Sequence, residues 1–378
     1  MKIKMVSTYP PMKCGIGEHA RHVVKSLQNA GIKPEIIRIK DRYSSNPFQF
    51  LDLARRAAKN TNEKDIIHIQ FQLTIFGKLF GILPGFYIIP FLMYLKSHTK
   101  AKIVMALHDS PSKDYSMKGS KKEKLLFYYF KFIYFFLKLY VDKFIAHSKN
   151  GERINIKEWK VKREKIVTLP LGLPTNIVNL NQNKCKEKLG YKDKKILLIL
   201  GYIRGSKNYD VVLDALAKLD KNFILLIAGE VQLEKDQVVY DNIVKKRDKL
   251  GLKDRVKLLG FVSDEKLTLL LNAADVGIDL RSQGGGDFLS STMAMEIAHN
   301  IPILGSGIPS FEKLKEEEKC IETFNENDVG DITKKINVLL KDKTKIAYLK
   351  KQTKEYWKKN NWNEIGKNTK RLYLSLIK

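Results

Sequence analysis

The sequence predicts an α/β protein made of two parallel-sheet domains in tandem. Short β-rich runs alternate with longer stretches of helical periodicity along the 378 residues, and this alternation is typical of βαβ units. The alternation starts afresh after residues 170–183, a segment rich in Pro, Gly and Asn that has no periodicity and is typical of a linker. A chain of this length suffices for two domains of ordinary size.

We expect residues 1–175 to form the first domain and residues 184–350 the second, with residues 351–378 as a C-terminal helix that crosses back to the first. Each domain should hold its own parallel sheet. The candidate strands are Ile3–Ser7, Glu35–Ile39, Asp65–Gln70, Lys102–Leu107, Lys143–His147 and Ile166–Leu169 in the first half, and Lys195–Leu200, Phe223–Ala228, Val256–Leu259, Val276–Leu280 and Pro302–Leu304 in the second.

The composition is that of a folded protein from a reducing compartment. Apolar residues make up 44% of the chain and charged residues 29%, which excludes a disordered sequence. Cys14, Cys185 and Cys320 lie far apart and form no CxxC pair, so neither a zinc site nor a disulfide framework is predicted. The first residues lack the apolar run of a signal peptide, and we expect a cytoplasmic protein.

Two apolar stretches could be mistaken for membrane spans, and we expect neither to be one. Residues 79–95 are about as long as the shortest spans and contain two prolines, whereas residues 125–140 contain Lys131 and Lys138. The net charge of +28 predicts attraction to nucleic acid, an anionic membrane or phosphorylated substrates. No recognition helix or RNA-binding motif accompanies it, so we expect no nucleic-acid partner.

A basic, aromatic segment in the first half is predicted to be an amphipathic helix. Lys124, Lys131 and Lys138 fall seven residues apart and so share one helix face. This pattern favours an interfacial membrane helix, while a buried helix with lysine tips in water is the alternative. The first interpretation predicts peripheral attachment to the inner face of a membrane, with a lipid-linked or membrane glycolipid acceptor.

Two segments at strand ends of the first half could bind a ligand. Gly15 and Gly17 precede a helix, and a glycine turn there presents free N–H groups that suit phosphate; a plain tight turn is the alternative. His108 follows the fourth strand, where it could hydrogen-bond a ligand hydroxyl or act as an acid or base. A structural histidine is the alternative for His108, and more so for His68.

The corresponding segments of the second half carry charge. Arg204 and Lys207 lie on the loop before a helix, where a guanidinium fork and an ammonium could hold a diphosphate; two solvated cations are the alternative. Asp287 follows a strand end at Leu280 and a triple glycine and stands near a helix start. There it would share free N–H groups with a bound sugar or phosphate, or simply be the N-cap.

These segments together resemble a known family. The chain shows YPP and CGIG before its first helix, then HIQ, LHD, GYIRGSK, AGE, LGFVSDEKL and AHNIP in that order. It is similar in this to the group 1, or family 4, retaining glycosyltransferases, from about Met5 to about Pro302. The resemblance implies the GT-B fold, in which two Rossmann-like domains face each other across a cleft. The first would be the acceptor side, and the second would bind the nucleoside diphosphate sugar.

The resemblance also implies roles for single residues. Gly17 would donate its N–H to the donor phosphate, His108 would contact the donor sugar, and Arg204 and Lys207 would neutralise the leaving diphosphate. Asp287 takes the place of the first glutamate of the family's E-x7-E motif, which contacts the donor sugar. Phe261 and Val262 would line the base pocket, and the further donor-binding candidates are Gly15, Gly229, Phe288, Leu289, Ser290 and Glu296.

The sequence departs from the family in this last motif. Eight residues after Asp287 stands Met295, which cannot replace a glutamate as a hydrogen-bond acceptor, with Glu296 next to it. Either Glu296 substitutes through a local shift, or the ribose is held otherwise. Asn300 replaces the usual glycine, and asparagine tolerates the left-handed conformation of a helix end.

The implied reaction transfers a sugar from a nucleoside diphosphate sugar to an acceptor hydroxyl with retention of configuration. The protein's main task would be to stabilise charge on the departing diphosphate; no DxD-type pair is evident, and we expect neither metal nor cofactor. GDP-mannose, UDP-glucose and UDP-N-acetylglucosamine are all compatible donors. The alternatives are a catalytically impaired GT-B-fold nucleotide-sugar-binding protein and, less in keeping with the motifs, a nucleotide-sugar epimerase.

Overall fold

The computed structural model describes residues 1–12, 14–109, 121–281 and 289–377. It divides into two compact units. The first consists of residues from Met1 to Gly172 together with the C-terminal segment from Trp362, and the second holds the described residues from Leu173 to Asn361. The C-terminal stretch is two helices, α14 (Lys343–Asn360) in the second unit and α15 (Trp362–Leu376) in the first.

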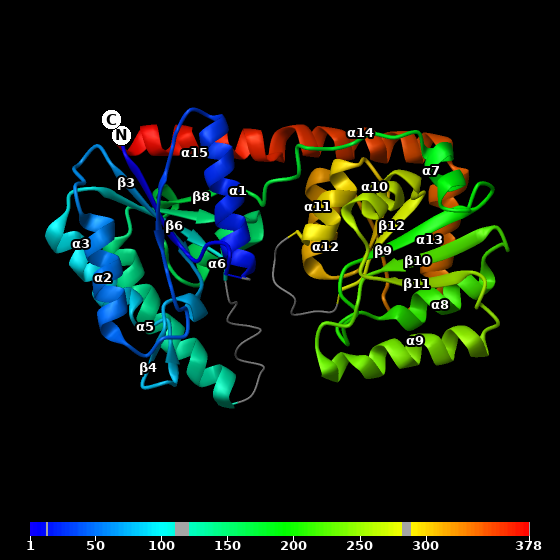
Figure 1. The fold of residues 1–378 in the computed structure, drawn as a ribbon, viewed down its shortest axis with the longest axis horizontal. Helices are drawn as coiled ribbons and strands as arrows, with labels where there is room; N and C mark the ends of the chain where they lie inside the picture. The colour runs from blue at the N-terminus through cyan, green and yellow to red at the C-terminus, as the bar shows by residue number, and fades with distance from the viewer. Residues whose placement is uncertain (13, 110–120, 282–288, 378) are drawn as a thin grey trace. The chain divides into compact units, whose positions relative to one another are not determined.

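The first unit is built on a six-stranded sheet with the order β2-β1-β3-β6-β7-β8 (Figure 1). Every neighbouring pair in it is parallel, and all six residues of β3 are buried, as expected of a parallel sheet covered on both faces. The strands are β1 (Ile3–Ser7), β2 (Glu35–Arg38), β3 (Ile66–Phe71), β6 (Lys102–Leu107), β7 (Lys143–Ala146) and β8 (Ile166–Thr168).

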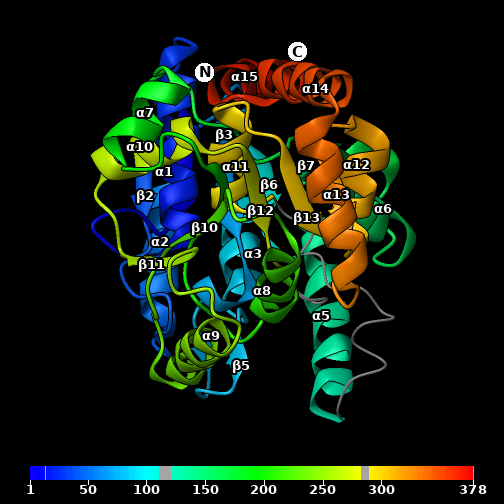
Figure 2. The ribbon, with the colours of Figure 1, turned by 90° about the vertical axis from the view of Figure 1, so that its right-hand side faces the viewer.

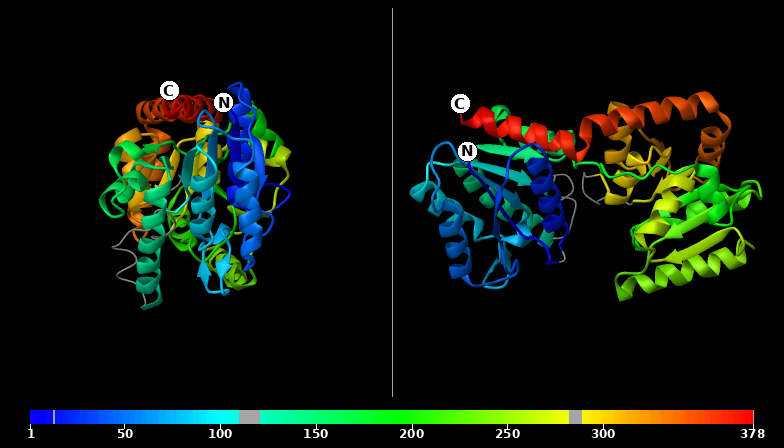
Figure 3. Two further views of the ribbon diagram at one scale, coloured as in Figure 1. Left: turned by 90° about the vertical axis from the view of Figure 1, so that its left-hand side faces the viewer. Right: turned by 45° about the horizontal axis from the view of Figure 1, so that its top comes forward.

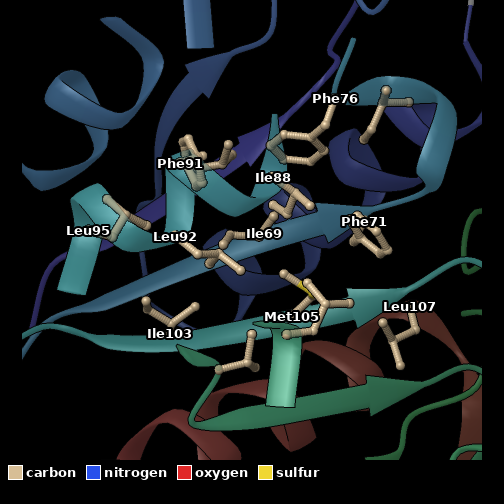
Figure 4. Packing of buried hydrophobic residues seen from close by; sticks show 14 of the residues in the cluster. Ile69, Phe71, Phe76, Ile88, Phe91, Leu92, Leu95, Ile103, Met105 and Leu107 are labelled. Atoms are coloured by element: carbon tan, nitrogen blue, oxygen red, sulfur yellow. The ribbon is translucent and has the colours of Figure 1, made fainter. Parts of the chain in front are cut away.

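Helices cover both faces of this sheet, because successive strand residues point to opposite sides. On one face Ile67, Ile69 and Met105 pack with apolar residues of α2 (Pro47–Ala58), α3 (Ile88–His98) and α5 (Lys121–Tyr140); Figure 4 shows part of this cluster. On the other face Ile66 and Val104 pack with α1 (Gly15–Asn29) and α15. These two helices cross and contact each other (Figure 3).

The second unit repeats this architecture with the strand order β11-β10-β9-β12-β13-β14, again all parallel (Figures 1 and 2). Helices α8, α9 and α13 cover one face, and α7 and α10 cover the other with α11 and α12. The elements are α7 (Gln182–Lys188), β9 (Lys195–Leu200), α8 (Tyr209–Lys218), β10 (Phe223–Ala228), α9 (Gln237–Lys249), β11 (Val256–Gly260), α10 (Asp264–Ala273), β12 (Val276–Asp279), α11 (Ser291–Ala298), β13 (Ile303–Ser306), α12 (Pro309–Glu318), β14 (Glu322–Phe324) and α13 (Val329–Lys341).

The predicted α/β class with two parallel sheets is confirmed, and each expected strand is present with bounds shifted by one or two residues at most. Three short strands were not expected: β14, and the hairpin of β4 (Lys78–Leu79) and β5 (Leu83–Pro84). Helix α6 (Lys149–Lys157) follows β7. None of the helices in the described part of the chain combines the length and the apolar character of a membrane span.

Candidate functional site

The glycine turn of the first unit brings the start of α1 close to the end of β1. Gly15 is the first residue of α1. A Cβ on Gly17 would lie 3.2 Å from the backbone nitrogen of Tyr9, so glycine at this position permits the close approach. Cys14 is the N-cap residue, and its side chain does not cap the helix. The backbone N–H groups of Ile16 and Gly17 interact with the Cys14 sulfur, and the positive end of the α1 dipole favours an anion at this turn.

Three histidines from three elements meet beside this turn. His19 lies on α1, His108 follows β6 and His147 follows β7. Their ring centroids are 4.8 to 4.9 Å apart in every pair. All three line a cavity of about 390 Å³, together with the start of α1, Arg42 and Asp109. The C-terminal ends of β6 and β7 thus open onto one site, as ligand sites of parallel sheets do.

A chain of hydrogen bonds orients His108 from behind. Its Nε2 lies 2.6 Å from the Gln70 side-chain oxygen, which can only accept, so Nε2 carries the proton. The Gln70 amide nitrogen donates to His68 Nε2 at 3.1 Å, and His68 Nδ1 bonds the hydroxyl of Tyr373 on α15. A neutral His108 therefore presents its Nδ1 lone pair. His68 is thus a buried, hydrogen-bonded histidine, in keeping with the structural role that its sequence context favours.

The histidines of this site are held in the neutral form. Burial lowers the pKa of His19 and of His108 well below the ordinary value, and the neighbouring imidazoles add to the effect. Burial likewise lowers the pKa of His147 and lowers that of His68 to about 3. At neutral pH these side chains act as hydrogen-bond partners or metal ligands, and they do not carry charge.

The second unit places the two predicted cations differently. Lys207 is half-buried, and its Nζ donates to the carbonyl of Leu200 at 3.1 Å, at the end of β9. Arg204 is exposed, and its guanidinium donates to Gln232 and lies over the ring of Tyr202. Lys207 and Arg281 line a cavity of about 320 Å³ next to the start of α8.

Two buried carboxyl groups lie near Lys207. Asp279 ends β12 and accepts a hydrogen bond from the Ser290 hydroxyl at 2.6 Å, while Glu296 on α11 is 1% exposed. Burial raises the pKa of both carboxyls and lowers that of the Lys207 ammonium, and the opposite charges moderate each shift. A Cβ on Gly277 would meet the Glu296 carboxyl at 2.7 Å, so this glycine makes the room that Glu296 occupies.

The remaining predicted residues fall into separate places. Ser290 is the N-cap of α11, where its Oγ accepts from the Met293 N–H. Gly229 packs against the backbone of Gly201, because a Cβ there would lie 2.2 Å from that carbonyl oxygen. Phe261 is 76% exposed, whereas Val262 and Leu289 pack against apolar clusters. Asp287 and Phe288 lie outside the described residues.

Two further positions answer questions that the sequence left open. Met295, at the place of the second motif glutamate, packs against the apolar cluster beneath α10. Its neighbour Glu296 is turned into the interior and is not among the residues that line the cavity beside Lys207. Asn300 has a φ of 56°, which confirms the expected left-handed conformation after α11.

Sequence reasoning missed four residues that contribute to these sites. His19 was passed over because it lies within a helix, and His147 because it was taken as the end of a strand. Asp279 and Arg281 were passed over because the sequence interpretation of this segment centred on the glycines that follow them. A stricter rule was available: polar residues at or just after the carboxyl end of each parallel strand mark the ligand edge. It would have found all of these except His19.

The fold is similar to that of several solved structures. HepE of Anabaena, solved in complex with UDP, superposes with a TM-score of 0.75 at 15% identity and covers 99% of this chain and 100% of its own. A glycosyltransferase from Rickettsia africae gives a TM-score of 0.74 at 18% identity and covers 100% and 99%. The predicted GT-B architecture is confirmed by these likenesses.

The sequence of the second unit matches a family model. Residues 181–359 match the model of the glycosyl transferases group 1, the family that the sequence motifs resemble. Mannosylfructose-phosphate synthase of Agrobacterium fabrum is 26% identical over 144 residues, which are 36% of this chain. The chain spans about a third, 32%, of the length of that curated relative.

Proposed function

We propose that the chain is a retaining hexosyltransferase that uses a nucleoside diphosphate sugar and acts on an acceptor at a membrane surface. The observation that supports this most is the cavity beside Lys207 and Arg281, at the carboxyl end of β9 and β12. It lies within the segment that matches the group 1 family. Two cations at a strand edge suit a diphosphate, which carries the charge that develops as the sugar leaves.

The state of Lys207 gives its proposed role a physical basis. Its ammonium is withdrawn from water, which lowers its pKa, and the backbone carbonyl of Leu200 fixes its Nζ. A diphosphate oxygen would favour the charged form, and a cation already held in place needs little reorganisation to stabilise the leaving group. Arg204, exposed on the same loop, can swing towards the outer phosphate.

His108 and Gly17 are proposed to serve the other end of the donor. His108 presents the lone pair of Nδ1, because its Nε2–H is committed to Gln70, and this lone pair can accept a hydrogen bond from a sugar hydroxyl. The N–H groups at the start of α1 are suited to a phosphate oxygen. We keep Asp287 as the sugar ligand and Phe261 with Val262 as the base contacts. UDP, present in the HepE complex, is the first nucleotide to try.

Helix α5 supports attachment to an anionic membrane. One side of the helix packs into the first unit. The opposite side presents an apolar stripe at spacings of three and four residues, which is a single helix face. Lys124 and Lys131 are exposed beside it, and Lys138 is half-buried. The stripe is Leu125, Tyr128, Phe132, Phe135 and Leu139, each between 48% and 71% exposed.

The β4–β5 hairpin extends this surface. Phe80 and Ile82 at its tip are 82% and 75% exposed, and the Tyr129 hydroxyl of α5 donates to the carbonyl of Pro84 in β5 at 3.0 Å. Exposed aromatic and aliphatic side chains flanked by lysines are typical of an interfacial element. A membrane at this face would bring a lipid-linked acceptor to the first unit.

Donor turnover tests the enzymatic proposal. Purified protein is incubated with UDP-glucose, GDP-mannose or UDP-N-acetylglucosamine and a lipid acceptor extract, and NMR follows the anomeric configuration of the product. We expect one donor to be consumed with retention, and Lys207→Ala to lower kcat/KM about 100-fold to 1000-fold. An inverted product would refute retention. A donor that binds and is never consumed would establish the catalytically impaired nucleotide-sugar-binding protein instead.

Sedimentation with vesicles tests the membrane proposal. The variant Phe132→Ser/Phe135→Ser should lose binding to anionic phosphatidylglycerol vesicles, while Phe48→Ser, which changes an exposed phenylalanine on α2, should bind like the unmodified protein. Neutral vesicles should bind weakly, since each lysine near an anionic surface contributes about 1 kcal/mol. Equal binding by both variants, or a stripe that instead mediates self-association, would contradict the proposal.

A further inference from the structure

The His19, His108 and His147 cluster has the dimensions of a metal site. Each of the three residues has a ring nitrogen that lies within 4.8 Å of a ring nitrogen of each of the other two. The ring centroids are 4.8 to 4.9 Å apart. A tetrahedral zinc ion about 2.0–2.1 Å from three imidazole nitrogens would set the centroids about 5 Å apart and the nitrogens about 3.3 Å apart. Metal binding would therefore draw the nitrogens closer together than they lie in this structure.

Hydrogen bonds behind two of the three rings select the tautomers that metal binding requires. His147 Nδ1 lies 3.0 Å from the carbonyl oxygen of Leu169, so Nδ1–H donates, and Nε2 is the nitrogen with the lone pair. His108 donates Nε2–H to the Gln70 oxygen, which leaves its lone pair on Nδ1. Carbonyl acceptors behind ligating imidazoles are the usual outer support of metal sites. Neutral imidazoles are also the form that binds metal.

The cluster is open to ligands on one side. It borders the cavity of about 390 Å³, so an ion can enter and a fourth position remains for water. We propose that His19, His108 and His147 bind one divalent transition-metal ion of the zinc class in the first unit. This ion would be additional to the donor chemistry proposed above.

The metal would be an inhibitor of transfer, an inference that rests on the proposed function. His108 would be both a metal ligand and the contact to the donor sugar. One lone pair cannot serve both partners, so the ion and the sugar exclude each other. Zinc at the site should therefore lower the rate of transfer, and a chelator should restore it.

Metal binding is tested directly on full-length protein without a histidine tag, after treatment with a chelator. Zinc titration by calorimetry should give one ion per chain, and Co²⁺ should develop the visible absorption of a tetrahedral nitrogen site. His19→Gln and His147→Gln should each weaken binding by at least about tenfold, a lower limit set by the 10- to 100-fold cost of losing even an outer partner. His98→Gln, on the exposed end of α3, is the matched control and should bind normally.

The outcomes separate the two proposals. Absence of a stoichiometric zinc event, or equal zinc affinity in all three variants, would refute the metal site. Melting temperatures measured without metal show whether the His19→Gln and His147→Gln proteins are folded, and any unfolded variant is replaced by the corresponding asparagine change. UDP binding is measured in parallel: zinc binding without UDP binding would support the metal site while contradicting the proposed function.

Discussion

The two units differ in the kind of polar side chain that they bury. In the first unit, four histidines are withdrawn from water and kept neutral, with a hydrogen-bond chain that ends at Tyr373. In the second, Lys207 lies near two buried carboxyl groups, Asp279 and Glu296, and attraction between opposite charges moderates the pKa shifts that burial causes. Under the proposed function, a similar strand edge would serve two tasks: hydrogen bonding to a sugar in one unit, and neutralising phosphate in the other.

The largest expected effect is a pH dependence of stability with opposite signs in the two units. The pKa of His68 falls from 6.5 to about 3 on folding, and those of His19, His108 and His147 are lowered too. The unfolded chain therefore binds more protons below pH 6.5, and stability is lost as the pH falls from there towards 3. Each such group contributes a slope of up to about 1.4 kcal/mol per pH unit.

The second unit should respond in the other direction. The pKa of Glu296 is raised by burial, so its contribution is fully present below the unfolded value of 4.5 and is lost as the pH rises through the folded value. Denaturant titrations from pH 5 to 8 measure the free energy of unfolding and check both signs. His68→Gln should reduce the loss of stability towards acid pH. Glu296→Gln should reduce the loss of stability towards alkaline pH. If His68→Gln loses stability towards acid pH as much as the unmodified protein does, the proposed contrast between the two units is wrong.

Gly277→Ala should have the next largest effect, because the added methyl would collide with the Glu296 carboxyl at 2.7 Å. We expect a loss of about 1–3 kcal/mol in the free energy of unfolding, the usual cost of overpacking. Glu296→Ala in the same chain should recover part of it, since contacting residues are coupled. Gly205→Ala, where the nearest atoms would be 3.8 Å away, is the control; an equal loss there would refute this packing account.

The smallest effect on stability is expected at Phe261. Its side chain is 76% exposed, so Phe261→Ala should change the free energy of unfolding by less than about 0.5 kcal/mol. Val262→Ala should cost more, since Val262 packs against the core cluster of the second unit. Denaturant midpoints measure both. If Phe261 contacts the base, its removal should still weaken UDP binding; unchanged affinity would remove it from the donor site.

The fold could be predicted because buried parallel strands are recognisable from short stretches of sequence. Runs such as Lys195–Leu200 and Phe223–Ala228 are nearly all apolar and are bounded by turns, as parallel strands should be. Strand β14 has only three residues, and the β4–β5 hairpin two in each strand, too few to carry a period.

The candidate site was only partly predictable, for a physical reason. His108 was predictable because it follows a strand directly, and Lys207 because it lies on the loop between a strand and the next helix. The histidine cluster brings together residues 19, 108 and 147 from three elements. These residues are far apart in the sequence, and their spacing does not predict that they lie close together. The burial of Glu296 depends on the absence of a side chain at Gly277 on a neighbouring strand, which only the folded packing reveals.

The most direct test of the account is the titration of UDP, with GDP and ADP alongside, into the unmodified protein, Lys207→Ala and Lys218→Ala. Lys218 is an exposed lysine at the end of α8 and serves as the matched control. The account predicts that one nucleotide binds the unmodified protein and Lys218→Ala alike, and binds Lys207→Ala at least about tenfold more weakly, the loss of one charge-assisted hydrogen bond. Equal affinity in all three proteins, or no binding of any nucleotide at millimolar concentration, would contradict it.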